Sequence, residues 1–416
     1  MKTKKIFNFL LLLGFLSGCD YLDIVPDNLP TLEMAFNNKS SAERFLFTCY
    51  SFVPEHGKIG TDPGMDVGDE VWYYSDNSAD YSNKTTFWIA KGMQNSNEPL
   101  VDYWNGTQWG KAMFVGIRDC NVFIENIEKV PDLSAYDKET WKAEAKVLKA
   151  FYHFWMMRMY GPIPIIKENI PVSAGEDEVR VVRDKIDDIV TYIVSLIDES
   201  VEYLPLNIQN EAAEMGRITR PAAKAIKAKI LAFAASPFFN GNLDYANFKN
   251  AEGEPFFNQV YDNEKWTKAA DACLEAIQCA EEAGHGLYEF VNMSSTQLSD
   301  ETILSLSNRC KVTERWNKEL VWGCGQSGIR DLQVLCQPWL ESNYSSDDRY
   351  HNARNGTFAP TLAVAETFYT KNGVPMDEDK NYDYSKRYTT QVATEADKYY
   401  ICLLYTSPSP RDRSLS

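Results

Sequence analysis

Four segments of the chain carry apolar residues at alternating three- and four-residue steps, and this period is what most constrains the fold. Such spacing gathers the apolar side chains on one face of an α-helix, which then has to be buried against another element. Gly161-Pro162 ends the first segment, Thr219 and Pro221 start the third, and Gly284 ends the fourth. The stripes are Trp141, Ala145, Leu148, Tyr152, Trp155 and Met159; Ile186, Ile189, Ile193, Leu196 and Ile197; Ala222, Ala225, Ile226, Ala228, Leu231, Ala232 and Ala235; and Trp266, Ala269, Ala270, Cys273, Ala276, Ile277 and Ala280.

Small side chains dominate the third and fourth segments, which lets helix axes approach closely. The segment centres lie roughly 33 to 46 residues apart, near the period of tetratricopeptide-like hairpins but without a strict repeat. A fifth helix is expected over 114–127, and short strands are expected at 164–166 and 319–322. The predicted fold class is mainly α, a tetratricopeptide-like helical-hairpin scaffold with few short strands and a large loop-rich region. That region comprises 54–110 and 286–380.

The N-terminal segment has the features of an export signal. Lys2, Lys4 and Lys5 precede an apolar run over 6–16, which as a helix would span roughly 16 Å, about half of the hydrocarbon core of a bilayer. We therefore interpret residues 1–18 as a signal peptide. Leu-Ser-Gly-Cys at its end has the pattern of a bacterial lipobox, so Cys19 is expected to carry the lipid and residues 19–31 to form a tether.

Charge and composition exclude several classes of protein. The chain has 59 acidic against 42 basic residues, a formal net charge of −17, so its surface repels phosphate backbones and no nucleic-acid partner is expected. The cysteines and histidines lack zinc spacing, and no metal is expected. The glycines of 323–328 match a dinucleotide fingerprint, but no βαβ unit surrounds them, so no cofactor is expected. A solvated loop rather than a calcium site is expected for Asp62, Asp66, Asp69 and Glu70.

The last residues differ from the rest of the chain. Residues 402–416 include the run Ser-Pro-Ser-Pro-Arg-Asp-Arg, which is similar to a translated sequencing adapter. We interpret 402–416 as a non-native tail and exclude it from the fold.

Several motifs, in this order and behind a lipobox, resemble the SusD/RagB family of outer-membrane nutrient-binding lipoproteins of Bacteroidetes. Each motif is weak when taken singly, and their order carries the resemblance. The motifs are Cys-Asp-Tyr-Leu-Asp at 19–23, the segment 109–126, Lys-Ala-Glu-Ala-Lys-Val-Leu-Lys-Ala-Phe-Tyr-His-Phe with Tyr-Gly-Pro-Ile-Pro within 142–164, Gly-Arg-Ile-Thr at 216–219, Trp-Thr-Lys-Ala-Ala at 266–270, Asn-Lys-Glu-Leu-Val-Trp at 317–322, and the segment 360–373.

The resemblance implies a receptor rather than an enzyme. Such a protein would lie in the outer membrane, held by its lipid anchor and facing the cell exterior, and would deliver oligosaccharides or polysaccharide to a SusC-like TonB-dependent transporter. It implies one SusD-like domain over 32–401, with an N-terminal part over about 32–240 and a C-terminal part over about 241–401. Family members usually continue with a late helix that this sequence lacks, so the C-terminal part is expected to be incomplete.

Sugar capture requires flat apolar rings for the C–H faces of the sugar and polar groups for its hydroxyls. The loop 69–109 is rich in both, and its residues cannot be transferred from the family because binding residues vary with the substrate. By contrast, Trp109, Trp141, Trp155 and Trp266 fall at helical spacing and are expected in the core, and His153 is expected to be a bonded core histidine. The candidate ligand-binding residues are Asp69, Trp72, Tyr73, Tyr81, Trp88, Trp104, Trp316 and Trp339.

Two alternative functions stay open at this point. A peptide-binding receptor of the same fold would share every motif above. A glycoside hydrolase would need two carboxylates roughly 5–10 Å apart in an aromatic cleft, and a chain with 59 acidic residues could contain such a pair.

Overall fold

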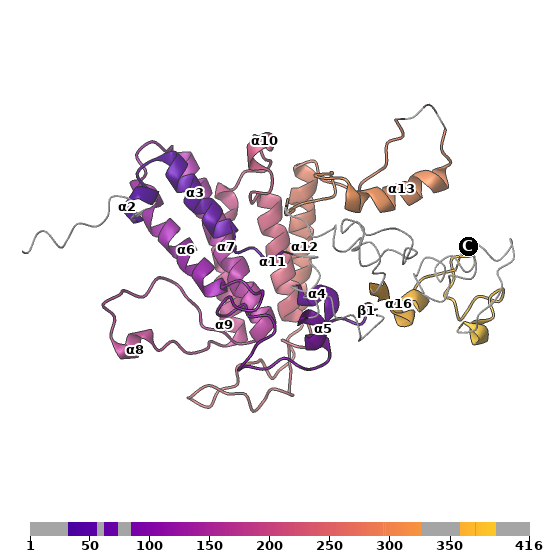
Figure 1. Cartoon of the computed structure of the whole chain (residues 1–416), viewed down its shortest axis with the longest axis horizontal. Coiled ribbons are helices and arrows are strands. Elements are labelled where there is room, and N and C mark those ends of the chain that lie inside the picture. The colour runs from indigo at the N-terminus through magenta and orange to yellow at the C-terminus, as the bar shows by residue number, and fades with distance from the viewer. Residues whose placement is uncertain are drawn as a thin grey trace, which may run out of the picture.

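The computed structural model describes residues 32–55, 62–73, 85–293, 295, 297–325, 358–370 and 372–387, and these are mainly helical (Figure 1). The signal peptide, the tether and the tail predicted at 402–416 lie outside the described residues. In chain order the elements, with η for a 3-10 helix, are α2 (Leu32–Ala35), α3 (Lys39–Tyr50), α4 (Pro63–Asp66), β1 (Val71–Tyr73), α5 (Thr85–Ala90), α6 (Met113–Asn126), η2 (Ile127–Lys129), α7 (Ala135–Tyr160), α8 (Glu176–Val179), α9 (Ile186–Asp198), η3 (Val201–Tyr203), α10 (Glu211–Glu214), α11 (Arg220–Ala235), α12 (Glu264–Glu282), α13 (Asp300–Thr313), β2 (Phe358–Pro360), α16 (Leu362–Glu366) and η5 (Tyr384–Lys386).

All five predicted helices form, as α6, α7, α9, α11 and α12. Their ends follow local chemistry. The Thr219 side chain accepts a hydrogen bond from the Ala222 amide and caps α11, whose first turn contains Pro221. Gly161 follows α7 with φ of +69°, a left-handed conformation that a glycine adopts without steric cost. The mainly α fold class is confirmed.

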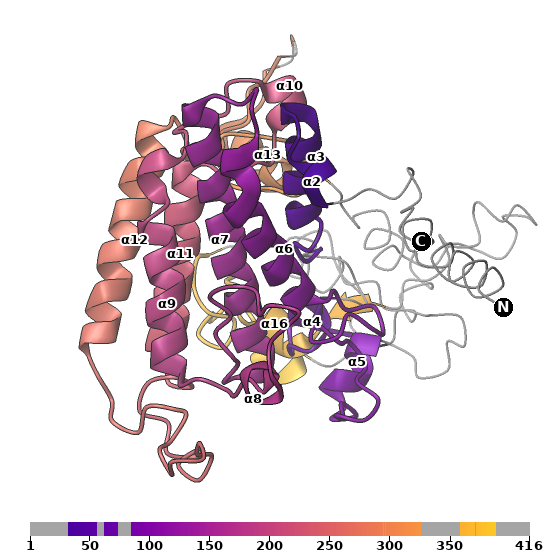
Figure 2. The same ribbon diagram turned by 90° about the vertical axis from the view of Figure 1, so that its left-hand side faces the viewer.

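The helices form a stack in which each packs on the next. Helix α6 packs on α7, α7 on α9, α9 on α11 and α11 on α12, with α3 against α6 and α7 at the other edge (Figure 2). None of the helices in the described part combines the length and the apolar character needed to cross a bilayer.

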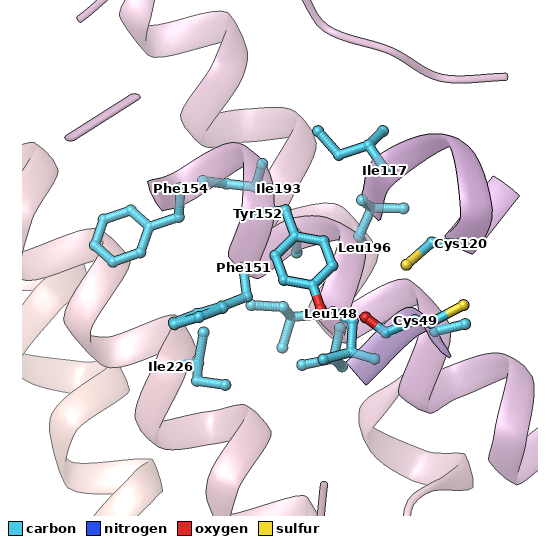
Figure 3. Packing of buried hydrophobic residues seen from close by; sticks show 14 of the residues in the cluster. Cys49, Ile117, Cys120, Leu148, Phe151, Tyr152, Phe154, Ile193, Leu196 and Ile226 are labelled. Atoms are coloured by element: carbon cyan, nitrogen blue, oxygen red, sulfur yellow. Dashed lines mark hydrogen bonds between the residues drawn. The ribbon is translucent and has the colours of Figure 1, made fainter. Parts of the chain in front are cut away.

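Helix α7 is the centre of the core. Its side chains are buried around most of its circumference because α3, α6, α9 and α11 all contact it. Figure 3 shows Tyr152 of α7, whose hydroxyl donates to the Cys49 carbonyl of α3. The side chains that meet there are Cys49, Ile117, Cys120, Leu148, Phe151, Tyr152, Phe154, Ile193, Leu196 and Ile226.

The two strands expected from the sequence are absent. Residues 164–166 pair with no strand. The Ile165 amide donates to Asp184 Oδ2 (2.7 Å) and the Ile166 amide to His153 Nε2 (3.2 Å), so side chains accept the hydrogen bonds that a neighbouring strand would accept. Residues 319–322 form turns and bends. The strands of the described part are β1 and β2, which pair antiparallel with Trp72 opposite Ala359.

Helices α3 and α13 were not predicted from the sequence. Helix α3 buries only Ala42, Leu46 and Cys49, a short stripe made partly of small side chains. Helix α13 buries only Ser307, and the apolar side chains on the same face, Ile303, Leu306 and Cys310, are half-buried.

Candidate functional site

Asp69 and Trp72 belong to a small unit in which distant parts of the chain meet. Thr361 joins β2 to the start of β1, because its hydroxyl donates to the Asp69 carbonyl (2.6 Å) and its amide to the Glu70 carbonyl (3.0 Å). Helix α4 contacts both β1 and α5, so the three elements lie together (Figure 1). On β1, the Trp72 side chain is 43% exposed.

Trp88 is presented by α5 in the same unit. Its side chain is 42% exposed, and the Lys91 ammonium lies 5.1 Å from the ring centroid. An indole exposed to this extent offers apolar surface that a ligand can cover, and the nearby cation interacts with its ring electrons. The fold therefore brings three predicted residues, Asp69, Trp72 and Trp88, onto or beside elements that lie together.

Trp104 has a different environment. Its ring packs edge-on against Phe114 (4.8 Å between centroids) and Tyr160 (5.5 Å), and the Arg183 guanidinium lies 5.3 Å from its centroid. Much of its surface is therefore taken up by contacts inside the protein, and less remains for a ligand than on Trp72 or Trp88.

Trp109 was expected in the core, and this expectation is wrong: the side chain is 63% exposed. Gln108 and Trp109 both have positive φ angles, 50° and 71°, in a turn where a side chain on Gly110 would collide with the Asp102 carbonyl. This tight turn, and not a helix, directs the indole outward. Glycines at 106 and 110 were the available signal for such a turn.

The buried carboxylate of Asp102 holds that turn together. It accepts hydrogen bonds from the Trp104 and Asn105 amides (both 2.9 Å) and from the Thr107 hydroxyl (2.8 Å). Burial by itself would raise the pKa of Asp102, but these bonds to the charged form keep that pKa below its usual range.

Trp266 was also expected in the core and is 42% exposed, on the outer face of α12. The stripe of α12 buries Ala269, Ala272 and Ala276 instead. Trp141 and Trp155 are buried as expected.

Trp316 lines a hollow of about 350 Å³ between the start of α11 and the segments that follow α12 and α13. Glycines flank its indole, since a Cβ on Gly216 would lie 3.6 Å from Cη2 and one on Gly323 would lie 3.2 Å from Cζ3. The neighbouring Trp322 donates from Nε1 to the Gly216 carbonyl (3.0 Å). Trp316 is therefore placed where a ligand of about one sugar ring could contact it.

The predicted residues do not form a single site. The hollow at Trp316 lies near α10, whereas Trp88 is on α5, toward the opposite end of the stack in both views (Figures 1 and 2). Tyr81 and Trp339 lie outside the described residues, and Tyr73 is described only as part of the β1 backbone.

A groove lies along the outer side of the stack, between α9, α11 and α12. Its volume is about 500 Å³, and Val190, Val194 and Leu231 contribute to its lining. The ion pair between Lys265 and Asp187 stands at its edge.

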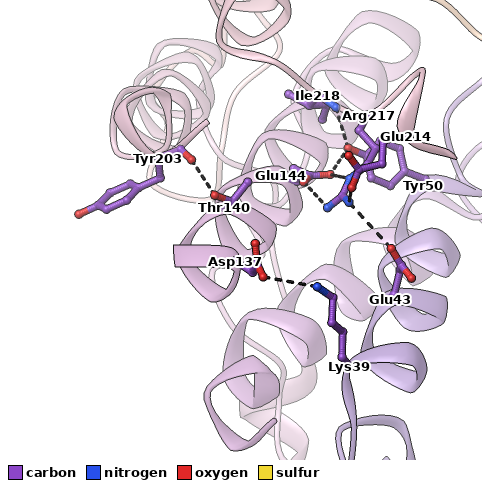
Figure 4. A network of polar contacts seen from close by, with 10 residues as sticks. All are labelled: Lys39, Glu43, Tyr50, Asp137, Thr140, Glu144, Tyr203, Glu214, Arg217 and Ile218. Carbon is purple, nitrogen blue, oxygen red and sulfur yellow. Dashed lines mark hydrogen bonds and ion pairs between the residues drawn. The ribbon is translucent and has the colours of Figure 1, made fainter. Parts of the chain in front are cut away.

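The most deeply buried charges belong to the scaffold (Figure 4). Arg217 donates to both carboxylate oxygens of Glu144, from Nε (3.1 Å) and Nη2 (2.6 Å), and the Tyr50 hydroxyl donates to Glu144 (2.6 Å) while accepting from the Ile218 amide (2.9 Å). Burial raises the pKa of Glu144, which Arg217 opposes. A raised carboxyl pKa can mark a catalytic acid, but this group is sealed from solvent, and the network ties α3 and α7 to the start of α11.

Within the described ranges, no cluster of three or more His, Cys, Asp or Glu side chains is arranged to hold a metal ion. Asp62, one of the acidic group at 62–70, instead caps α4 by accepting a hydrogen bond from the Gly64 amide (2.9 Å).

Comparison with protein families matches residues 20–231, just over half of the chain, to the SusD-like family described as starch-binding and associating with the outer membrane. A search of curated proteins gave no significant match.

Among solved structures, the protein named BT4246 is 28% identical with a TM-score of 0.69, over 86% of this chain and 61% of that one. A SusD-like protein (BF3747) from Bacteroides fragilis is 15% identical with a TM-score of 0.56, over 82% and 55%. Surface glycan-binding protein A from Bacteroides uniformis is 15% identical with a TM-score of 0.50, over 79% and 61%. The last two likenesses show the fold alone, and this chain spans less than two thirds of the length of each protein.

Proposed function

This chain belongs to the SusD-like family, and from that membership we propose that it is a lipid-anchored receptor on the outer face of the outer membrane. It binds oligosaccharides or polysaccharide and delivers them to a SusC-like TonB-dependent transporter. The family description supports starch-like glycans and the outer membrane. The name of the surface glycan-binding protein from Bacteroides uniformis agrees with this cargo, although that likeness is one of fold.

The observation that carries the proposal is that Trp72 and Trp88 are both exposed, on two elements that α4 joins. Each indole is more than two-fifths exposed, and α4 contacts both of the elements that bear them. Flat rings of this kind stack on the C–H faces of a pyranose, and nearby polar groups such as Asp69 supply hydrogen bonds to its hydroxyls. Trp109, Trp316, and Tyr81 and Trp339 outside the described residues, are further candidates for contact.

We propose binding without catalysis. Glu144, whose pKa burial raises, is bonded to Arg217 and Tyr50 inside the scaffold. A hydrolase needs its acid at a surface that a glycan can reach, so this carboxylate serves the scaffold.

The test is a Trp72→Ala/Trp88→Ala double variant, compared with Trp266→Ala, which removes an equally exposed indole from α12. Wild type should bind one or more of amylopectin, laminarin and xyloglucan saturably in affinity electrophoresis, without release of reducing ends. The double variant should bind about tenfold more weakly, a loss of about 1.4 kcal/mol, and Trp266→Ala should bind as wild type does. Reducing ends that appear in the same tubes would contradict the receptor and favour the hydrolase.

A peptide cargo is the second candidate, and the groove between α9, α11 and α12 is the observation that favours it. Its lining combines apolar Val190, Val194 and Leu231 with charged groups of both signs, as a short peptide would require. Binding of a mixed peptide library, weakened by Val194→Asp and unaffected by any polysaccharide, would select this function over the glycan receptor.

A further inference from the structure

A column of three aromatic rings runs from the core to the surface in the connection between α11 and α12. The Phe257 ring lies between Phe239 (5.9 Å between centroids, 19° between planes) and Tyr245 (4.8 Å, 24°). Phe239 and Phe257 are buried, whereas Tyr245 is 40% exposed. Phe257 stacks on the Tyr245 ring, Phe238 packs edge-on against it (5.5 Å between centroids, 65° between planes), and about two-fifths of Tyr245 stays exposed.

The connection that carries this column is held in a fixed shape. The Asn240 side chain donates to the Asp262 carbonyl and accepts from the Asp262 amide (both 2.8 Å), which joins the two ends of the segment. Gly241 has φ of +77°, and a Cβ there would lie 2.8 Å from the Tyr261 nitrogen, so only glycine fits. An aromatic ring on such a support loses little conformational freedom when a ligand binds.

Two residues close to Tyr245 in the sequence have polar side chains that bond to no other group of the described chain. Asp244 and Asn247 are both exposed. Across the described part of the chain, neither the Asp244 carboxylate nor the Asn247 side-chain amide takes part in a hydrogen bond or ion pair. The Asn242 amide, by contrast, is used within the loop, since it donates to the Phe238 carbonyl (2.9 Å).

We propose that Tyr245, with Asp244 and Asn247, forms a second glycan-binding platform. A partly exposed flat ring, a carboxylate and an amide are what a pyranose needs for stacking and for hydrogen bonds to its hydroxyls. Because Asp244 and the net charge of −17 repel anions, the ligand class is a neutral polysaccharide rather than a uronic-acid or sulfated one.

This inference rests on the proposed function and extends it. The connection between α11 and α12 lies beyond the same end of the helical stack as α5, which carries Trp88 (Figures 1 and 2). A long glycan that contacts both platforms binds more tightly than a short one through effective concentration, whereas a short oligosaccharide occupies one platform only.

The experiment measures binding of amylopectin, laminarin and xyloglucan, with polygalacturonate as the anionic comparison, to the full chain and three variants. Tyr245→Ala should bind the neutral polysaccharide about tenfold more weakly than wild type, and Tyr245→Phe, which keeps the ring, should stay within about twofold. The matched control is Tyr136→Ala, which removes an exposed tyrosine from the start of α7, and its binding should equal that of wild type.

The outcomes separate this inference from the proposed function. Unchanged binding by Tyr245→Ala, with loss in Trp72→Ala/Trp88→Ala, would overturn the second platform alone. Absence of binding by wild type to all three neutral polysaccharides would overturn both. Stronger binding of polygalacturonate than of the neutral chains would overturn the assigned ligand class.

Tyr245→Ala also removes a packing contact of Phe257 and could lower the stability of the fold. A further variant therefore separates loss of binding from loss of folding. Asp244→Ala/Asn247→Ala deletes only exposed groups and should melt as wild type does while binding the neutral polysaccharide about fivefold more weakly. Unchanged affinity in this variant would overturn the polar half of the platform.

Discussion

At the residue scale, the polar side chains buried in α7 each have a specific partner. His153 Nδ1 lies 2.8 Å from the Lys149 carbonyl oxygen, so it carries the hydrogen, and Nε2 accepts from the Ile166 amide (3.2 Å). The Lys149 ammonium donates to the Lys167 carbonyl (2.6 Å), and burial lowers its pKa to about 8. The sequence-based expectation that His153 is a bonded core histidine is confirmed.

The burial of neutral His153 predicts a loss of stability in acid. Burial lowers its pKa to about 4, so between pH 6.5 and that value the unfolded chain takes up a proton that the native protein does not. The free energy of unfolding should therefore fall as pH drops through this window, by up to about 3 kcal/mol, and this contribution should level off below it. Urea unfolding at a series of pH values measures the effect.

The matched variants for this prediction are His153→Gln and His285→Gln. The glutamine at 153 cannot titrate, so the difference in unfolding free energy between wild type and His153→Gln should shrink as pH falls. His285 lies near the surface after α12, and its variant should keep the acid sensitivity of wild type. Equal pH slopes in wild type and His153→Gln would contradict the assignment.

At the scale of elements, the contact between α11 and α12 depends on alanines. Ala228 of α11 is buried against Ala272 and Ala276 of α12, with Leu231 at the margin. Methyl groups allow the two axes to approach, and the ion pair of Lys224 with Glu275 (3.4 Å) lies across the same contact. The outer face of α12 has no such neighbour among the described elements.

This difference between the two faces of α12 predicts the effect of a larger side chain. Ala272→Leu should destabilise the protein by about 1–3 kcal/mol, because added methylenes in a close helix contact force the backbones apart. Ala270→Leu, two residues earlier and therefore on the opposite, exposed side of the helix, should change the unfolding free energy by less than about 0.5 kcal/mol. Thermal unfolding followed by circular dichroism compares the two, and similar losses would show that α12 does not pack through Ala272.

At the scale of the whole molecule, the proposed receptor needs both a glycan surface and a membrane anchor. The described part supplies the first as a rigid helical stack with exposed rings on its connections, Trp88 and Tyr245 among them. For the second we propose Cys19, which precedes the described residues. A diacyl or triacyl group there would hold the domain at the membrane, since one acyl chain alone binds only reversibly.

Anchoring by lipid predicts a simple change of fractionation. Cys19→Ala should move the protein from the membrane pellet to the soluble fraction when cells are lysed and centrifuged. Cys49→Ala, which removes a buried thiol of the folded domain, is the control and should stay in the pellet. A Cys19→Ala protein that remains with the membrane would contradict the lipobox interpretation.

Local chemistry in the sequence determined the helices of the stack. The stripes of α9 and α11, the Thr219 cap and the glycine after α7 act within a few residues of one another, so they could be recognised without a structure. The motifs behind the lipobox likewise carried the family resemblance, which the match over 20–231 confirms.

Only the tertiary structure decided which aromatic rings face solvent. Trp266 has core spacing in the sequence, yet it is exposed because no described element covers the outer face of α12. Trp316 is placed in its hollow by Gly216, one hundred residues earlier in the chain, and Tyr245 gains its orientation from Phe257. Periodicity reports which side chains share a face, but exposure depends on what packs against that face, and that contact comes from residues far away in sequence.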